Sequence, residues 1–113
     1  MYRLHGFCQS GNTFKVAFLL RALTQPWEPV FVDFMHGATR NPAWRETANE
    51  MGEVPVLEHR DLVLTQSGVI LDYLAQRYRD FGPRSEEERR EVLRWTFWDN
   101  HKLTGSVAPL RYL

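Results

Sequence analysis

Hydrophobic and polar residues follow two different periods in the first third of the chain. Residues 2–7 alternate in character, which predicts a short strand, and the β-branched and aromatic run within 27–34 predicts a second one. Between them, apolar residues recur at helical spacing, with Asn12 or Thr13 as the expected N-cap. Pro26 is expected to end this helix, because proline has no amide hydrogen to donate to a helical hydrogen bond. The pattern predicts a βαβ unit with parallel strands and a right-handed crossover.

The middle of the chain predicts a helix and then a hairpin followed by a longer helix. Residues 36–52 are more polar, and Pro42 suits the first position of a weak helix. Residues 54–58 and 62–65 read as two strands joined by a tight polar turn. Ser67 is expected to cap the third helix. The predicted fold class is therefore α/β, with the order βαβ, helix, ββα.

A break in composition predicts a domain boundary. Glycine and proline stand side by side within the linker 81–84 and separate a first domain, 1–80, from a second region, 85–113. The second region opens with a charged helix whose Ser85 and Glu88 fit a capping box. Its apolar face needs a cover, from a second chain or from further residues of a longer chain. That face comprises Val92, Trp95, Trp98 and Leu103.

Composition narrows the classes of partner. The 113 residues include 14 Lys and Arg against 14 Asp and Glu, so no basic excess favours nucleic acid. The apolar runs are too short for a membrane span, and none is expected. Cys8 is the single cysteine, which fits a reducing, cytoplasmic location. The four histidines are scattered, so no metal site is expected.

Three short segments carry candidate chemistry. In the first, Ser10 and Asn12 stand at the expected start of a helix, where unpaired amides and the helix dipole favour an anion such as a thiolate. The Ser10 hydroxyl is suited to donate a hydrogen bond to such a group. The simpler interpretation is turn and capping chemistry, and the segment by itself favours that.

The second and third segments each have a structural and a functional interpretation. If the Val54–Pro55 bond is cis, the backbone of Val54 turns outward and pairs with an extended peptide; a trans proline would merely open an edge strand. Gln66 and Ser67 offer an amide, a hydroxyl and free N–H groups that fit a carboxylate. The commoner role of such a pair is to cap a helix.

These segments together resemble the N-terminal domain of the cytosolic glutathione transferases. Residues 10–16 resemble the serine-bearing opening of the bacterial, theta-like and nu-like branches, 54–57 the cis-proline segment and 66–74 the following helix signature. The resemblance covers residues 2–80 and implies a thioredoxin-like fold. Residues 85–113 resemble the first helix of the family's all-helical second domain, of which only the start is present.

The resemblance assigns roles to the residues of the first two segments. It implies that Ser10 donates a hydrogen bond to the glutathione thiolate, with help from Asn12. It also implies that Val54 pairs through its backbone with the cysteinyl part of glutathione, next to a cis Pro55.

The resemblance also assigns the residues that hold the ends of the tripeptide. Gln66 and Ser67 would bind the γ-glutamyl end, and His36 or Arg40 is the candidate for the glycyl carboxylate. Gln66 stands where an acidic residue is commoner. Glu53 brings a negative charge beside the ligand where the family often has Lys or Gln, and both departures weaken the expected site.

The implied activity is glutathione S-transferase, with glutathione as co-substrate and a small electrophile or peroxide as the second substrate. The resemblance also implies a homodimer and no metal. The alternative is a non-catalytic interaction module, similar to bacterial stringent-starvation-type proteins. Because the family's electrophile pocket lies between two domains, a chain with little of the second is expected to bind glutathione yet turn over poorly.

Overall fold

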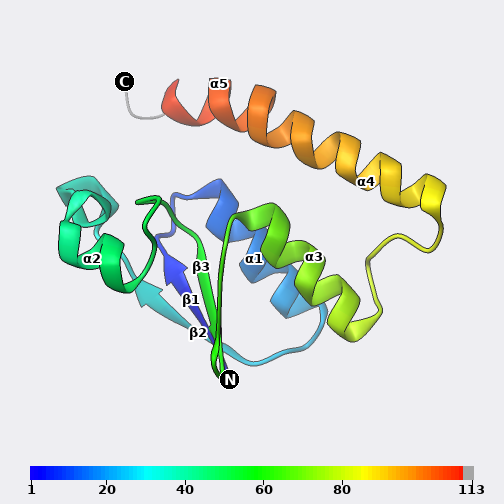
Figure 1. Cartoon of the computed structure of the whole chain (residues 1–113), viewed down its shortest axis with the longest axis horizontal. Coiled ribbons are helices and arrows are strands. Elements are labelled where there is room, and N and C mark those ends of the chain that lie inside the picture. Colours follow the sequence, from blue (N-terminus) through cyan, green and yellow to red (C-terminus); the bar gives the residue numbers. More distant parts are fainter. Residues whose placement is uncertain (111–113) are drawn as a thin grey trace. The chain divides into compact units, whose positions relative to one another are not determined.

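The computed structural model describes residues 1–110, and the chain divides into two compact units, residues 1–78 and 79–113 (Figure 1). The first unit holds a mixed sheet with helices. The second is helical.

Four strands form the sheet of the first unit, in the order β2-β1-β3-β4. They are β1 (Tyr2–Gly6), β2 (Trp27–Phe31), β3 (Val56–His59) and β4 (Leu62–Thr65). β2 is parallel to β1, whereas β3 is antiparallel to both β1 and β4. The predicted βαβ unit and hairpin are therefore present. The second strand ends earlier than residue 34, because the chain turns there into a 3-10 helix.

Three α-helices and two 3-10 turns complete this unit. They are α1 (Gly11–Ala22), η1 (Phe34–His36), η2 (Ala38–Arg40), α2 (Pro42–Thr47) and α3 (Ser67–Tyr78). Helices α1 and α3 lie side by side on one face of the sheet, and α2 lies toward the other side (Figure 1). The order βαβ, helix, ββα gives the thioredoxin-like arrangement that the sequence predicts.

The core lies between the sheet and the pair α1 and α3. β1 alternates between buried and more exposed side chains, and α1 buries positions four residues apart. The alternation of the strand and the helical spacing of α1 therefore both place apolar side chains in this core. The fully buried cluster comprises Tyr2, Leu4, Val16, Leu20, Leu57, Ile70 and Leu74. Phe14 and Phe18 share the helical period of α1, yet they are 63% and 65% exposed.

The second unit is a run of helix: α4 (Glu86–Trp98), a π-helical turn η3 (Asp99–Leu103) and α5 (Thr104–Leu110). The Ser85 hydroxyl accepts a hydrogen bond from the Glu88 backbone N–H at 3.1 Å, as predicted. The Glu88 carboxylate instead accepts from the backbone N–H of Arg84, so only half of the capping box forms. Within residues 79–110 no side chain is buried.

The helices of residues 1–110 include none with the length and apolar character that crossing a membrane requires.

Candidate functional site

The register of the sheet brings all the predicted site segments to one end. His5 of β1 pairs with Val56 of β3, which in turn pairs with Thr65 of β4, and Gly6 pairs with Phe31 of β2. The chain therefore leaves β1, β2 and β4 and enters β3 at the same end of the sheet. The loop before α1, the Val54–Pro55 segment and the start of α3 are consequently neighbours in space.

Ser10 is the N-cap of α1, which corrects the prediction of Asn12 or Thr13. Its hydroxyl oxygen accepts a hydrogen bond from the Thr13 backbone N–H at 3.1 Å, and its carbonyl accepts from the Phe14 N–H at 2.9 Å. The helix starts earlier than predicted because β1 ends at Gly6 and only a short loop follows. Ser10 is 8% exposed, and accepting one hydrogen bond leaves its hydroxyl hydrogen available for donation.

Gly6 sets how closely β1 approaches the start of α1. A Cβ at this position would lie 2.4 Å from the Cγ2 and Oγ1 atoms of Thr13, which is far inside van der Waals contact. The Thr13 hydroxyl oxygen is itself buried and has no hydrogen-bond partner within residues 1–110. The role of Gly6 is not predictable from the sequence, because a glycine at the end of a strand has no distinctive signal. The absence of a side chain at Gly6 therefore lets β1 and the first turn of α1 approach each other closely.

Asn12 connects the starts of α1 and α3. Its Oδ1 accepts a hydrogen bond from the Lys15 ammonium at 2.8 Å and a longer one from the Ser67 hydroxyl at 3.5 Å. Two of the predicted residues, 55 positions apart, therefore meet directly. Lys15 is an addition to the predicted set. Its place one helical turn after Asn12 could have suggested it.

Gln66 caps α3 through its backbone, so the prediction that Ser67 is the N-cap is wrong. The Gln66 carbonyl accepts from the Ile70 N–H at 3.0 Å, and Ser67 is the first helical residue. Gln66 has a left-handed backbone (φ 72°), an uncommon conformation for a residue other than glycine. Its side-chain amide donates to the Met51 sulfur at 3.3 Å, so it turns toward the loop that precedes β3.

The loop before β3 is braced by Asn49, a residue that sequence analysis did not single out. The Asn49 side-chain amide donates to the Glu53 carbonyl at 2.9 Å and its oxygen accepts from the Met51 N–H at 3.0 Å. Asn49 is 5% exposed. The Val54–Pro55 peptide bond that follows is cis, and the backbone groups of Val54 have no hydrogen-bond partner within residues 1–110.

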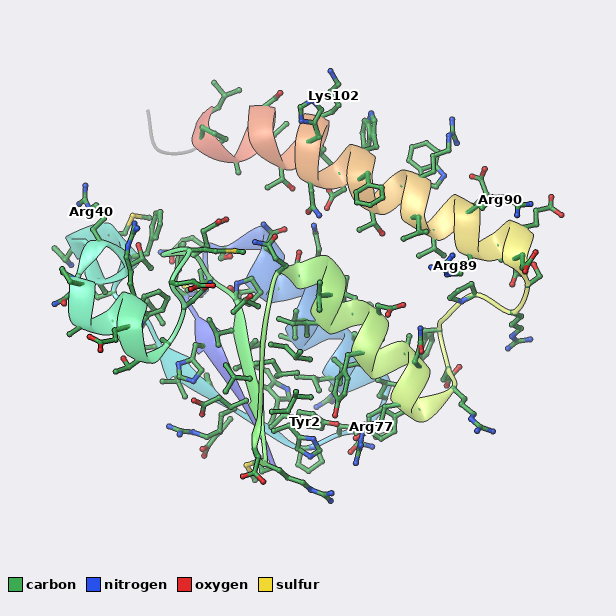
Figure 2. All side chains as sticks on the ribbon, in the orientation of Figure 1. Tyr2, Arg40, Arg77, Arg89, Arg90 and Lys102 are labelled. Carbon is green, nitrogen blue, oxygen red and sulfur yellow. The ribbon has the colours of Figure 1, made fainter. Side chains whose placement is uncertain are left out.

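His36 and Arg40 lie in the 3-10 turns that follow β2, at the same end of the sheet. His36 is 83% exposed and its Nδ1 lies 2.8 Å from the Asp33 carboxylate. Arg40 is exposed, at the other end of the unit from Tyr2 (Figure 2). The structure joins neither side chain to Asn12 or Ser67 by a hydrogen bond within residues 1–110.

A second cluster of ionisable groups lies at the opposite end of the sheet. The Tyr2 and Tyr78 hydroxyls are 2.5 Å apart, and the Tyr2 ring stacks on His59 at 4.0 Å between centroids. Burial, with help from the Tyr78 hydrogen bond, raises the pKa of Tyr2. Burial and the nearby charge of Arg77 lower the pKa of His59. This cluster joins α3 to β1 and is remote from the predicted site.

The chemistry offered at the site end of the sheet suits an anionic, peptide-like ligand. The hydrogen-bond donors are the N–H groups of two helix starts, the hydroxyls of Ser10 and Ser67, the side-chain amide of Asn12 and the Lys15 ammonium. The backbone groups of Val54, unpaired within residues 1–110, suit an extended chain. Within the part of the chain that the structure describes, no three or more His, Cys, Asp or Glu side chains gather in a way that could hold a metal ion.

Comparison with known proteins points to one family. The family described as "Glutathione S-transferase, N-terminal domain" matches residues 1–76. Glutathione S-transferase F14 of Arabidopsis thaliana is 36% identical over 88 residues, which cover 74% of this chain and 35% of that protein. The chain thus spans about a third of this relative's length.

Two solved structures extend the likeness to nearly the whole chain. A glutathione S-transferase from Pseudomonas fluorescens is 33% identical with a TM-score of 0.89, over 98% of this chain and 55% of that one. A theta class glutathione S-transferase from Xanthomonas axonopodis pv. citri, solved with glutathione bound, is 28% identical with a TM-score of 0.82, over 92% and 50%. The family match, the sequence identity and the shared fold agree, and the chain belongs to the glutathione S-transferase family, with residues 1–76 forming its N-terminal domain.

Proposed function

We propose that the chain binds glutathione at the site end of its sheet and stabilises the glutathione thiolate for attack on an electrophile or a peroxide. The observation that supports this proposal is the contact between Asn12 and Ser67, which joins the starts of α1 and α3. Ser10 caps the first of these helices, and the backbone of Val54 is unpaired within residues 1–110. The glutathione bound in the relative from Xanthomonas axonopodis supports the choice of ligand.

In this proposal the thiolate is held by hydrogen bonds rather than replaced by a protein nucleophile. The Ser10 hydroxyl donates to the sulfur and the Asn12 amide donates from the other side. Hydrogen bonds to the charged form favour ionisation, and the dipole of α1 acts in the same direction. The ionised sulfur then forms a bond to an electrophilic carbon, and the leaving group departs with the electron pair of the broken bond.

The remaining contacts orient the tripeptide. The Val54 N–H and C=O pair with the cysteinyl residue as an added strand would. Gln66, Ser67 and the free N–H groups of α3 hold the γ-glutamyl end, and His36 or Arg40 reaches the glycyl carboxylate. Residues 1–80 would form this glutathione-binding domain and 85–113 the start of a helical one, in a homodimer of the whole protein.

The test is the ionisation of bound glutathione. Calorimetry measures the affinity, and the ultraviolet absorbance of the thiolate measures its pKa on the protein. Ser10→Ala is expected to raise that pKa and to lower kcat/KM about 10- to 150-fold, because a hydrogen bond to a charged group contributes about 1.5–3 kcal/mol. Gln76→Ala, near the C-terminal end of α3 and so away from the site within the same unit, is the control and is expected to leave both unchanged.

Two outcomes would contradict the proposal in different ways. If the wild-type chain shows no saturable binding of glutathione, the transferase proposal fails and a non-catalytic interaction module takes its place. The exposed carboxylate of Glu53, next to Val54, would favour that alternative. If glutathione binds but Ser10→Ala leaves the thiol pKa and the turnover unchanged, only the role of Ser10 fails.

A further inference from the structure

The side-chain amide oxygen of Asn12, at the start of α1, accepts two hydrogen bonds. Lys15 donates to Asn12 Oδ1 at 2.8 Å from one helical turn away, and the Ser67 hydroxyl approaches the same atom at 3.5 Å from α3. Both contacts are half-buried. Asn12 is thus held from its own helix and from the neighbouring one.

The chemistry of Lys15 decides which way the amide of Asn12 points. An ammonium has three donors and no acceptor, so the atom it contacts must be the amide oxygen. The orientation therefore follows from the partner, which removes the usual ambiguity between the oxygen and nitrogen of an amide. The Nδ2 group, with two N–H donors, must lie on the side of the amide away from Lys15 and Ser67.

We infer that Lys15 is a positioning residue, which turns the N–H donors of Asn12 toward a ligand anion bound at the start of α1. This inference rests on the proposed function and deepens it by naming the group that selects the donor face of Asn12. Without the ammonium, the amide can rotate by half a turn and offer its oxygen to the anion. The partly negative amide oxygen would then face the thiolate, which would lose a donor.

The test is a double-mutant cycle on the full chain. The measured quantity is the pKa of the glutathione thiol when glutathione is bound to the protein. Lys15→Met keeps the length of the side chain and removes its donors, and it is expected to raise the thiol pKa by about 1 unit, the equivalent of one hydrogen bond to a charged group. Asn12→Ala is expected to raise it by a similar amount. The double variant should show no further rise beyond Asn12→Ala, because Lys15 acts through Asn12.

Two further variants separate positioning from charge and from damage to the fold. Lys15→Arg also carries only donors and is expected to restore the wild-type thiol pKa. Arg21→Met removes one positive charge from the last turn of the same helix and is expected to change nothing. Circular dichroism of each variant checks that α1 is intact.

Three results would overturn the inference. The first is an unchanged thiol pKa in Lys15→Met. The second is a Lys15→Met effect that persists in full in the Asn12→Ala background, since the ammonium would then act directly by its charge. The third is a wild-type chain that binds no glutathione, which overturns the proposed function as well and is recognised before any variant is made.

Discussion

The two units of the chain obtain their structure in different ways. Residues 1–78 bury a cluster of side chains drawn from two strands and two helices. Within residues 79–110 no side chain is buried, and large apolar groups such as Trp95 and Phe97 are more than half exposed. The same sequence thus contains one region with a core and one region of helix without a core of its own.

The contrast separates local from non-local causes of structure. Helix α4 forms where Ser85 caps the chain and three glutamates, Glu86 to Glu88, complement the dipole of the first turn. These are interactions between near neighbours, each with a small contribution to stability. The first unit instead depends on contacts between distant segments, and its site is a product of the same contacts.

The largest expected effect on the free energy of unfolding distinguishes a buried leucine in α3 from a more exposed leucine in α4. Leu74 of α3 is 0% exposed and Leu93 of α4 is 36% exposed. Leu74→Ala is expected to lower the free energy of unfolding by about 2–5 kcal/mol, because it removes buried surface and leaves a cavity. Leu93→Ala is expected to change it by no more than about 0.5 kcal/mol. Urea unfolding followed by circular dichroism measures both, and equal losses would erase the distinction between the units.

A smaller effect is expected where β1 meets α1. Gly6→Ala places a Cβ 2.4 Å from Thr13 and is expected to lower the free energy of unfolding by about 1–3 kcal/mol through overpacking. Gly11→Ala, with open space around the new Cβ, is the control and should be neutral or slightly stabilising. Thr13→Ala added to Gly6→Ala should recover part of the loss. A neutral Gly6→Ala would show that the strand and the helix start are not in close contact.

The loop before β3 provides a third comparison, between two asparagines. Asn49→Ala leaves the Glu53 carbonyl and the Met51 N–H without their partner and is expected to lower the free energy of unfolding by about 1–2 kcal/mol, since water reaches part of this loop. Asn100→Ala, in η3, is the matched control and should stay within about 0.5 kcal/mol of wild type. Thermal unfolding of both variants is a sufficient measurement. Indistinguishable midpoints would contradict a bracing role for Asn49.

The smallest effect concerns the Tyr2 and Tyr78 pair. Because the pKa of Tyr2 is raised above its ordinary value of 10.0, the folded chain keeps a proton that the unfolded chain releases at high pH. This stabilisation is complete below pH 10 and is lost as the pH rises above it. Tyr2→Phe is expected to lower the free energy of unfolding by about 0.5–1.5 kcal/mol at neutral pH and to flatten the alkaline decline.

A double variant tests whether the two hydroxyls act as a pair. Tyr2→Phe and Tyr78→Phe together should reduce stability by clearly less than the sum of the single variants, because both remove the same hydrogen bond. Additive losses in urea unfolding between pH 7 and pH 11 would show that the two groups act independently.

The elements of the fold are largely predictable from the sequence because their signals are local. The alternation of residues 2–7, the proline at position 26 and the tight turn between β3 and β4 each specify a structure within a few residues. The exact start of a helix is less determined. Ser10, Asn12 and Thr13 are all good capping residues, and only the end of β1 at Gly6 decides among them.

The details of the site were harder to predict because they depend on packing between distant segments. The period of α1 does not reveal which of its apolar residues face the core, and Phe14 and Phe18 lie outside it. Asn49 looks like any polar loop residue until its two backbone partners are seen. The meeting of Asn12 with Ser67 joins two helix starts that only the sheet topology brings together.

The central claim is that glutathione binds at the end of the sheet where these helices start, and a titration of the labelled chain with glutathione by nuclear magnetic resonance tests it most directly. We expect saturable changes in the amide signals of Ser10, Val54 and Ser67, with the turn at Arg60, at the opposite end of the same sheet, unaffected. Changes confined to the Arg60 turn, or the absence of any saturable change, would contradict this claim.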